Sequence, residues 1–366
     1  MLKSAGIVII AAFLLAGCAN LSYRVPDESL PPNWPPTNEV QNLQLPQPPR
    51  SNVPVVKTNP PPVAHPTNAA PRAPVTTWAP LSRWAADHKI GAPYLLSGQP
   101  VAMYALGSTN GVMVMEIGSR EAIWNGIEIN LGFQPQLIDR QIYLHELDLQ
   151  RNLEPLLCDP PLSFGSNRVI VIDPGHGGSN TGTRSVLDGR FEKEFTLDWA
   201  KRLAALLETN GWQVFLTRTN DVYVANSDRA VFAAAHNADL FISLHFNSGA
   251  PDPTAHGLET YCLTPTGMPS TLIRGYNDFW SDNYSNNAFD TANLQCAVRL
   301  HSALLRTTGL EDRGVARARF IEALRSERCP AILIEGGYLS NPREAKLIES
   351  PDFRQKLAEA VADALK

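Results

Sequence analysis

The sequence predicts an α/β fold for the second half of the chain, with a mainly parallel twisted sheet flanked by helices. Three short, continuous apolar runs indicate such a sheet, because parallel strands are usually buried on both faces. Helical patterns and two further strand patterns alternate with these runs, which is the order of an α/β domain. A small β-rich domain and a proline-rich, disordered linker are expected before it.

Residues 1–18 predict a lipoprotein signal peptide. Their uncharged, largely apolar run (5–17) spans 13 residues, whereas crossing a bilayer core takes about 20. Leu15-Ala16-Gly17-Cys18 resembles a bacterial lipobox, and this resemblance implies that Cys18 is lipidated and becomes the mature first residue. Ala19 stands where an aspartate would indicate inner-membrane retention, so the resemblance favours the outer membrane, facing the periplasm. An ordinary cleaved signal peptide is the alternative.

Residues 19–77 predict a proline-rich disordered tether. Half of the 30 prolines lie between Pro26 and Pro74. This density disfavours helix and favours extended polyproline II, which rises about 3.1 Å per residue. A semi-rigid spacer and a flexible tail both fit the composition, and neither is a folded domain.

Residues 78–160 predict a small β-rich accessory domain with a short helix at Leu81–Ala86. The stretch 124–149 weakly resembles the small repeat domain at the N-terminus of some copper amine oxidases. A spacer or docking role is expected, and the ligand of this domain stays open. Alternating apolar segments separated by Asn-Gly turns, as in hairpins, are found at Val112–Met115 and Ile127–Leu131, with turns at Asn110-Gly111 and Asn125-Gly126.

Residues 165–366 predict the α/β domain itself. Helices are expected at Phe195–Thr209, before Asn210-Gly211, and at about Ser227–Asn237. Strands are expected at Trp212–Thr217 and Leu258–Leu263, besides the three apolar runs. The alternation of these elements favours parallel pairing.

Each of the three apolar runs leads to a residue that can bind a metal or transfer a proton. In open α/β sheets, sites form outside the carboxyl ends of the strands. A lone histidine is usually structural, but three such residues at matching places predict one shared site. The runs Val169–Ile172, Leu240–Leu244 and Ala331–Ile334 lead to His176, His245 and Glu335.

Five segments in the second half carry a family resemblance. They look like the zinc-dependent N-acetylmuramoyl-L-alanine amidases of the amidase-3 type, and they occur in that family's order between about Arg168 and Leu365. The resemblance implies hydrolysis of the amide that joins the lactyl group of N-acetylmuramic acid to the L-alanine of the stem peptide. The segments are VIVIDPGHGG, FEKEFTLDWAKRLAALLE, LTRTND, ADLFISLHFN and PAILIEGGYLSNP.

The resemblance also implies the roles of individual residues. His176, Glu192 and His245 match the family's zinc ligands, and Glu335 matches its catalytic glutamate. Glu194 is the competitor of Glu192, with a solvated charge in the first helical turn as its other interpretation. Thr196 stands where the family usually has asparagine.

These residue types suit zinc-dependent amide hydrolysis. Two imidazoles and one carboxylate fill three of about four tetrahedral zinc positions and leave one for water. Zinc acidifies such a water and polarises a carbonyl. Glu335 is expected to take a proton from the water and deliver it to the departing alanine nitrogen.

Other polar residues have structural interpretations. His256 is expected in a surface loop, and His236 and His301 on helices. Arg229 has either a packing and salt-bridge role or a substrate contact. Four cysteines would lie where disulfides form, with three pairings open, at Cys158, Cys262, Cys296 and Cys329.

The segment 264–292 is longer than the usual connection of about 4–6 residues. It contains several aromatic residues among Asn, Asp and Ser, so it is interpreted as a wall or lid of a substrate groove. An ordered decoration packed on the domain is the alternative. The aromatic residues are Tyr276, Phe279, Trp280, Tyr284 and Phe289.

The net charge and the family resemblance indicate which classes of binding partner to expect. A net charge of −5 gives no basic footprint, so nucleic acid is not an expected partner. Peptidoglycan is the expected substrate, and a membrane is reached through Cys18. A regulatory protein and the stem-peptide preference stay open. The alternative functions are a zinc peptidase or deacetylase of the cell wall, and a noncatalytic wall-binding lipoprotein.

Overall fold

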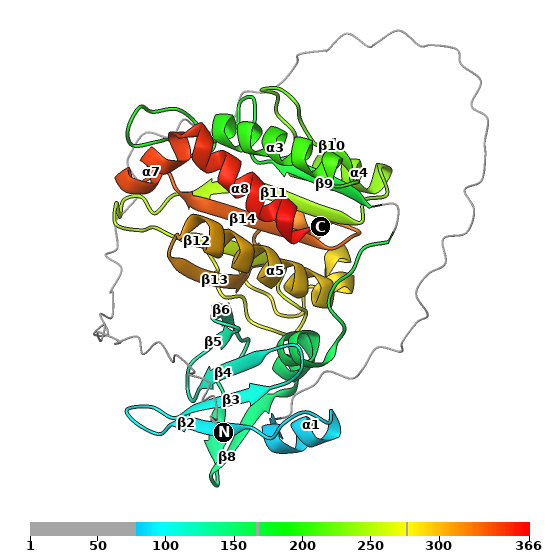
Figure 1. Cartoon of the computed structure of the whole chain (residues 1–366), viewed down its shortest axis with the longest axis vertical. Coiled ribbons are helices and arrows are strands. Elements are labelled where there is room, and N and C mark those ends of the chain that lie inside the picture. The colour runs from blue at the N-terminus through cyan, green and yellow to red at the C-terminus, as the bar shows by residue number, and fades with distance from the viewer. Residues whose placement is uncertain (1–77, 166–167, 276) are drawn as a thin grey trace, which may run out of the picture. The chain divides into compact units, whose positions relative to one another are not determined.

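The computed structural model describes residues 78–165, 168–275 and 277–366 (Figure 1). The predicted signal peptide, the lipidated Cys18 and the tether lie outside the described residues. The described residues belong to one compact unit, and their division into domains 78–160 and 165–366 stays a prediction. None of their helices combines the length and the apolar character that a bilayer crossing requires.

One large sheet runs through the described residues. Its eleven strands are ordered β10-β9-β11-β14-β12-β13-β6-β5-β4-β3-β2. Six of them come from the second half of the chain: β9 (Val169–Pro174), β10 (Gln213–Leu216), β11 (Leu240–Asn247), β12 (Leu258–Cys262), β13 (Asp312–Arg317) and β14 (Ala331–Tyr338).

The second half forms the predicted, mainly parallel sheet. Strands β10, β9, β11 and β14 pair in parallel with one another, in that order. Strand β12 reverses direction against β14, and β13 follows β12 in parallel. Every residue of β9 is buried, which agrees with the continuous apolar run from which this strand was predicted.

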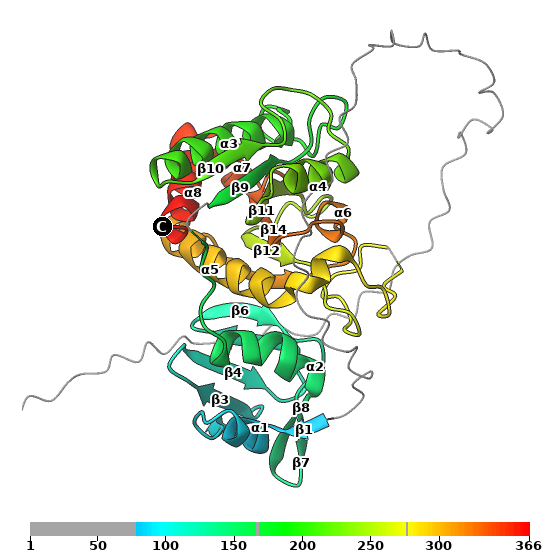
Figure 2. The same cartoon turned by 90° about the vertical axis from the view of Figure 1, so that its right-hand side faces the viewer.

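Helices cover both faces of this sheet. Figure 2 shows α3, α5 and α8 on one face and α4 and α6 on the other. The helices are α3 (Glu192–Thr209), α4 (Asn226–Ala235), α5 (Asp290–Thr308), α6 (Glu322–Arg325), α7 (Pro342–Glu349) and α8 (Pro351–Ala364), with a 3₁₀ turn η2 (Ser285–Phe289) before α5.

Helix α3 begins one turn before the predicted start at Phe195. The Glu194 carboxylate accepts a hydrogen bond from the backbone N–H of Phe191 at 3.1 Å. This contact gives the backbone N–H of the N-cap residue a hydrogen-bond partner. The helix can therefore begin at Glu192.

The residues from 78 to 158 form the predicted β-rich part. Strands β2 to β6 make an antiparallel meander, and the predicted hairpin turns at Asn110-Gly111 and Asn125-Gly126 are confirmed. Strands β1, β8 and β7 form a separate three-stranded sheet. The elements are β1 (Trp78–Pro80), α1 (Leu81–Asp87), β2 (Tyr94–Ser97), β3 (Met103–Gly107), β4 (Val112–Glu116), β5 (Glu121–Trp124), β6 (Ile127–Asn130), β7 (Gln136–Ile138), β8 (Gln141–His145), α2 (Glu146–Asp148) and a π-helix, η1 (Leu149–Cys158).

Strand β6 connects the two parts of the large sheet. Ile129 pairs with Val315 of β13 in parallel, and an Asp312 carboxylate oxygen accepts the backbone N–H of Glu128 at 2.9 Å. The sheet therefore continues from the α/β part into the β-rich part.

The cysteines give no disulfide in the described residues. Cys262, Cys296 and Cys329 are buried thiols and Cys158 is half-buried. Burial raises the pKa of Cys296 to about 12, which disfavours the reactive thiolate form.

Candidate active site

The carboxyl ends of three neighbouring strands bring the predicted residues together. His245 of β11 lies directly opposite Glu335 of β14. Strand β9 lies on the other side of β11, and His176 follows β9 after one intervening residue. This placement confirms the inference that the three strand ends meet at one edge of the sheet.

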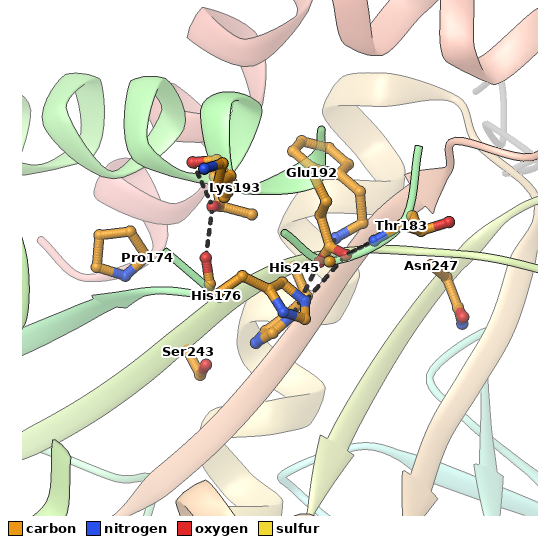
Figure 3. Close-up of polar contacts among 12 residues, drawn as sticks. Pro174, His176, Thr183, Glu192, Lys193, Ser243, His245 and Asn247 are labelled. Carbon is orange, nitrogen blue, oxygen red and sulfur yellow. Dashed lines mark hydrogen bonds and ion pairs between the residues drawn. The ribbon is translucent and has the colours of Figure 1, made fainter. Parts of the chain in front are cut away.

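Glu192 lies between the two imidazoles. Its Oε1 is 2.9 Å from Nδ1 of His245, and its Oε2 is 3.0 Å from Nε2 of His176. The three side chains converge in Figure 3, and their potential metal-ligating atoms lie within 4.8 Å of one another. Backbone N–H groups of Thr183 and Phe246 also bind the carboxylate, at 3.0 and 3.1 Å. The carboxylate is therefore fixed from several sides.

Glu194 has a different position. Its carboxylate binds the backbone N–H of Phe191 at the start of α3, and it is absent from the His-Glu-His cluster found among the described residues. The structure thus favours Glu192 over its competitor.

Close packing around the cluster requires glycine at two positions. A Cβ atom on Gly175 would lie 2.3 Å from Cε1 of His245, and one on Gly182 would lie 2.5 Å from Oε2 of Glu192. A Cβ atom does not approach an unbonded heavy atom this closely. The backbone therefore approaches both side chains more closely than any other residue type would permit.

Buried polar contacts hold the loop that carries His176. His176 has a φ of 63°, a left-handed conformation that is uncommon outside glycine. Arg229 donates to the His176 carbonyl at 3.1 Å and forms a buried ion pair with Asp173. Asp173 also accepts hydrogen bonds from Thr217 and Ser243, at 2.5 and 2.7 Å.

The ring of His176 is oriented by Asn180. Its Nδ1 is 2.9 Å from Oδ1 of Asn180. Donation from Nδ1 leaves Nε2 for the cluster, which is the arrangement that metal-ligating histidines commonly adopt.

Thr196 supports the same loop. Its hydroxyl donates to the Gly175 carbonyl at 2.9 Å, and the Arg218 guanidinium donates to the same carbonyl at 2.8 Å. Thr196, which stands where the family usually has asparagine, is therefore a buried residue that supports this loop.

Charge in the cluster favours a cation. Burial would raise the pKa of Glu192, but hydrogen bonds from His176 and His245 hold it well below its usual range. Burial opposes the charged form of His176, yet the facing Glu192 carboxylate raises the pKa of this imidazole above its ordinary value. Glu192 is therefore ionised at neutral pH.

Glu335 is held as a weak acid beside the cluster. Burial raises its pKa to about 8, with the negative charges of Glu192 and Glu259 adding to the rise and His245 opposing it. Its Oε2 is shielded and has no hydrogen-bond partner among the described residues. This carboxyl group is available for proton transfer.

A cavity of about 420 Å³ opens over the cluster. The predicted residues His176, Glu192, His245 and Glu335 all line it, and so does Arg229. Sequence reasoning missed further polar side chains in its wall, because no local pattern distinguishes them; among them are Asn180, Asn247 and Arg274.

Three other histidines lie away from this cavity. His256 is exposed in a loop, 2.7 Å from Glu311. His236 caps α4 and contacts two phenylalanine rings. His301 is buried between Thr260 and Asp312, at 2.9 Å from each.

The second half of the chain is similar in sequence to known proteins. The family described as N-acetylmuramoyl-L-alanine amidase (Amidase_3) matches residues 170–366. The amidase AmiA of Salmonella typhimurium is 31% identical over 224 residues, covering 55% of this chain and 76% of that protein. The amidase AmiC of Neisseria meningitidis serogroup B is 32% identical over 240 residues, covering 60% and 56%.

A solved structure is also similar. The N-acetylmuramoyl-L-alanine amidase from Clostridium difficile 630 is 32% identical, with a TM-score of 0.46, over 55% of this chain and 96% of that one. The family match spans more than half of the chain and includes every side chain of the cluster. The chain belongs to the N-acetylmuramoyl-L-alanine amidase family.

Proposed function

We propose that this chain hydrolyses the amide between the lactyl group of N-acetylmuramic acid and the L-alanine of the stem peptide in peptidoglycan. His176, Glu192 and His245 hold a zinc ion, and Glu335 transfers the proton. The observation that carries this proposal is the Glu192 carboxylate fixed between two imidazoles in a family of amidases. Beside it lies Glu335, whose Oε2 has no hydrogen-bond partner among the described residues.

The donor set fits zinc. Two imidazole nitrogens and one carboxylate oxygen are the ligands of many catalytic zinc sites, in which a fourth position stays open. The three side chains line an open cavity, and Asn180 supplies the outer hydrogen bond expected for a ligating histidine. When bound, zinc supplies Lewis acidity at the scissile carbonyl and acidifies a water.

Glu335 carries the proton between the two halves of the reaction. Water adds its oxygen to the carbonyl carbon, and Glu335 accepts the proton that the water loses. The carbon–nitrogen bond then breaks, and Glu335 gives this proton to the departing alanine nitrogen. A carboxyl group whose pKa lies close to the working pH can both accept and return a proton, and burial raises the pKa of Glu335 toward that range.

End-group analysis of digested peptidoglycan tests this function. Mass spectrometry should detect free stem peptides that begin with alanine, in amounts that chelation abolishes and added zinc restores. Peptides cleaved at another bond, or released acetate, would instead identify a peptidase or a deacetylase. No soluble product at all, with zinc bound, would leave only a wall-binding role.

The same proposal extends to the cell envelope. The lipobox-like sequence ending at Cys18 supports lipid attachment, and residues 19–77 would then separate the anchor from the folded part. We place the protein at the outer membrane, facing the periplasm. A Cys18→Ser variant should lose incorporation of labelled fatty acid and leave the membrane fraction; unchanged labelling would contradict the anchor.

A further inference from the structure

The active-site cavity contains one arginine that forms no salt bridge among the described residues, although its charge lowers the pKa of the nearby Glu335, which burial raises. Arg229 and Arg274 both line the cavity. Arg229 is buried and paired with Asp173. Arg274 is solvent-exposed and has no ion-pair partner among the described residues; its polar contact is Asn247, at 3.4 Å. Arg274 thus has most of its N–H donors unused in the cavity wall.

The geometry around Asn247 leaves the Arg274 guanidinium largely free. The side-chain nitrogen of Asn247 donates to Glu259 at 2.6 Å, which fixes the amide so that its oxygen faces Arg274. A guanidinium has five N–H donors, and this oxygen accepts from only one nitrogen, at a long distance. The Phe320 ring lies 5.3 Å from the central carbon of the guanidinium and supports it from one side.

The backbone turns sharply at Arg274. Its φ is 44°, and that of the following Gly275 is 75°. Two consecutive residues in the left-handed region are costly for the arginine, and such conformations cluster at functional sites. Here the turn belongs to the segment that delivers the side chain to the cavity wall.

The segment 264–292 is anchored on both sides of this turn. Asp278 pairs with the buried Arg319 at 2.6 Å and also binds Ser270. Arg120 of the β-rich part donates to the backbone carbonyls of Pro269 and Ser270, at 3.3 and 3.4 Å. Arg274 therefore projects from a supported loop.

The described aromatic residues of this segment do not form the predicted wall, and the predicted Tyr276 lies outside the described residues. None of those that the structure describes lines the cavity. Trp280 instead contacts Phe133 of the β-rich part, with ring centroids 5.9 Å apart, and Tyr284 lies beneath the Arg325 guanidinium. The contribution of the segment to the cavity is the charge of Arg274.

In peptidoglycan, carboxylates are the groups that the Arg274 guanidinium could bind as ion-pair partners. The sugars of the glycan strand are neutral, and the lactyl carboxyl is consumed in the scissile amide. Free carboxylates lie on the stem peptide, beginning with the α-carboxylate of the D-isoglutamate that follows alanine. Arginine binds carboxylates through paired, charge-assisted hydrogen bonds.

We propose that Arg274 binds the first free carboxylate of the stem peptide and so directs the peptide side of the substrate toward segment 264–292. This inference rests on the proposed amidase function. It makes Arg274 a specificity-determining residue that distinguishes acidic stem peptides from those in which this carboxylate is amidated.

Two matched substrates test the proposal. One is N-acetylmuramoyl-L-Ala-D-isoglutamate extended by the third stem residue, and the other is the same compound with D-isoglutamine. For Arg274→Gln, kcat/KM on the acidic substrate should fall by about tenfold to a hundredfold. On the amidated substrate it should change by less than about threefold, within the spread of ordinary surface substitutions. The loss should appear mainly in KM, with zinc content unchanged.

Two further variants serve as controls. Arg274→Lys keeps the charge and should retain part of the preference for the acidic substrate. Arg328→Gln removes an exposed arginine outside the cavity and should leave both rates unchanged.

Equal losses on both substrates, or none on either, would overturn the proposal for Arg274. Failure of the wild-type protein to release an alanine-terminated peptide from either compound would instead refute the amidase function itself. The two failures are therefore distinguishable.

Discussion

His245 and Glu335 are direct cross-strand partners on β11 and β14. Both are interior strands of the sheet, and β11 has parallel neighbours on either side. The backbone register therefore sets the separation between a proposed zinc ligand and the proposed proton carrier. A site built on rigid strands holds its geometry more closely than one built on loops.

Metal binding and proton transfer should separate by mutation. Glu335→Gln should keep its zinc, because Glu335 lies outside the His-Glu-His cluster, and should lose about 10²–10⁴-fold in kcat. His176→Ala should lose zinc as well as activity. Metal analysis alongside turnover measures both effects. Full activity of Glu335→Gln, or full zinc content of His176→Ala, would contradict the assigned roles.

Gly175→Ala should disable the site while the sheet remains intact. The added Cβ would lie 2.3 Å from the His245 ring, so the imidazole must move away from Glu192. Zinc affinity and turnover should both fall by about tenfold or more, which is the usual effect of losing a group that orients a metal ligand. Gly165→Ala is the matched control, since no atom lies within 4 Å of its added Cβ. Equal zinc affinities of the two variants would refute this account.

Arg229→Met should destabilise the fold. The change leaves Asp173 buried without its ion-pair partner, which typically costs about 3–5 kcal/mol. Denaturant unfolding of the zinc-free protein measures the loss. Arg343→Met, at an exposed position, should change the unfolding free energy by less than about 0.5 kcal/mol. Similar values for the two variants would mean that the ion pair contributes little.

Glu327 should make stability depend on pH. It is fully buried, neither carboxylate oxygen has a hydrogen-bond partner among the described residues, and burial raises its pKa from 4.5 to about 8, with the Asp173 charge adding to the rise. The pKa of this carboxyl group is therefore higher in the folded protein than in the unfolded chain. Its contribution to the free energy of unfolding is fully present below the unfolded-state pKa. That contribution is lost as the pH rises to the folded-state pKa.

Comparison with Glu327→Gln isolates that effect. Between pH 4.5 and 8, the wild-type unfolding free energy should fall relative to that of the variant by at most about 1.4 kcal/mol per pH unit. Urea titrations at several pH values measure the difference. A constant difference across this range would show that Glu327 does not titrate as the structure implies.

The sequence was sufficient for features that have local patterns. Continuous apolar runs predicted β9, β11 and β14, and the residues that follow them predicted the meeting of His176, His245 and Glu335. The choice of Glu192 over Glu194 came from the family resemblance, and the structure adds the physical reason. Glu194 is used at the entrance of α3, whereas Glu192 faces both imidazoles.

Features that depend on distant contacts were not predictable in this way. Arg274 reaches the cavity because Arg120 and Arg319 position its segment from two sides. The pairing of Ile129 with Val315 joins strands that are 186 positions apart in the printed numbering. Hydrophobic periodicity reports which face of an element is buried, and it carries no information about which distant element covers that face.

Hydrolysis in water enriched in ¹⁸O tests the central claim most directly. If the lactyl–alanine amide is the bond that breaks, mass spectrometry should find one ¹⁸O atom in the lactyl carboxylate of N-acetylmuramic acid and none in the released peptide. The Glu335→Gln variant should give no label above background. Label in a carboxylate of the peptide, or in released acetate, would contradict the account.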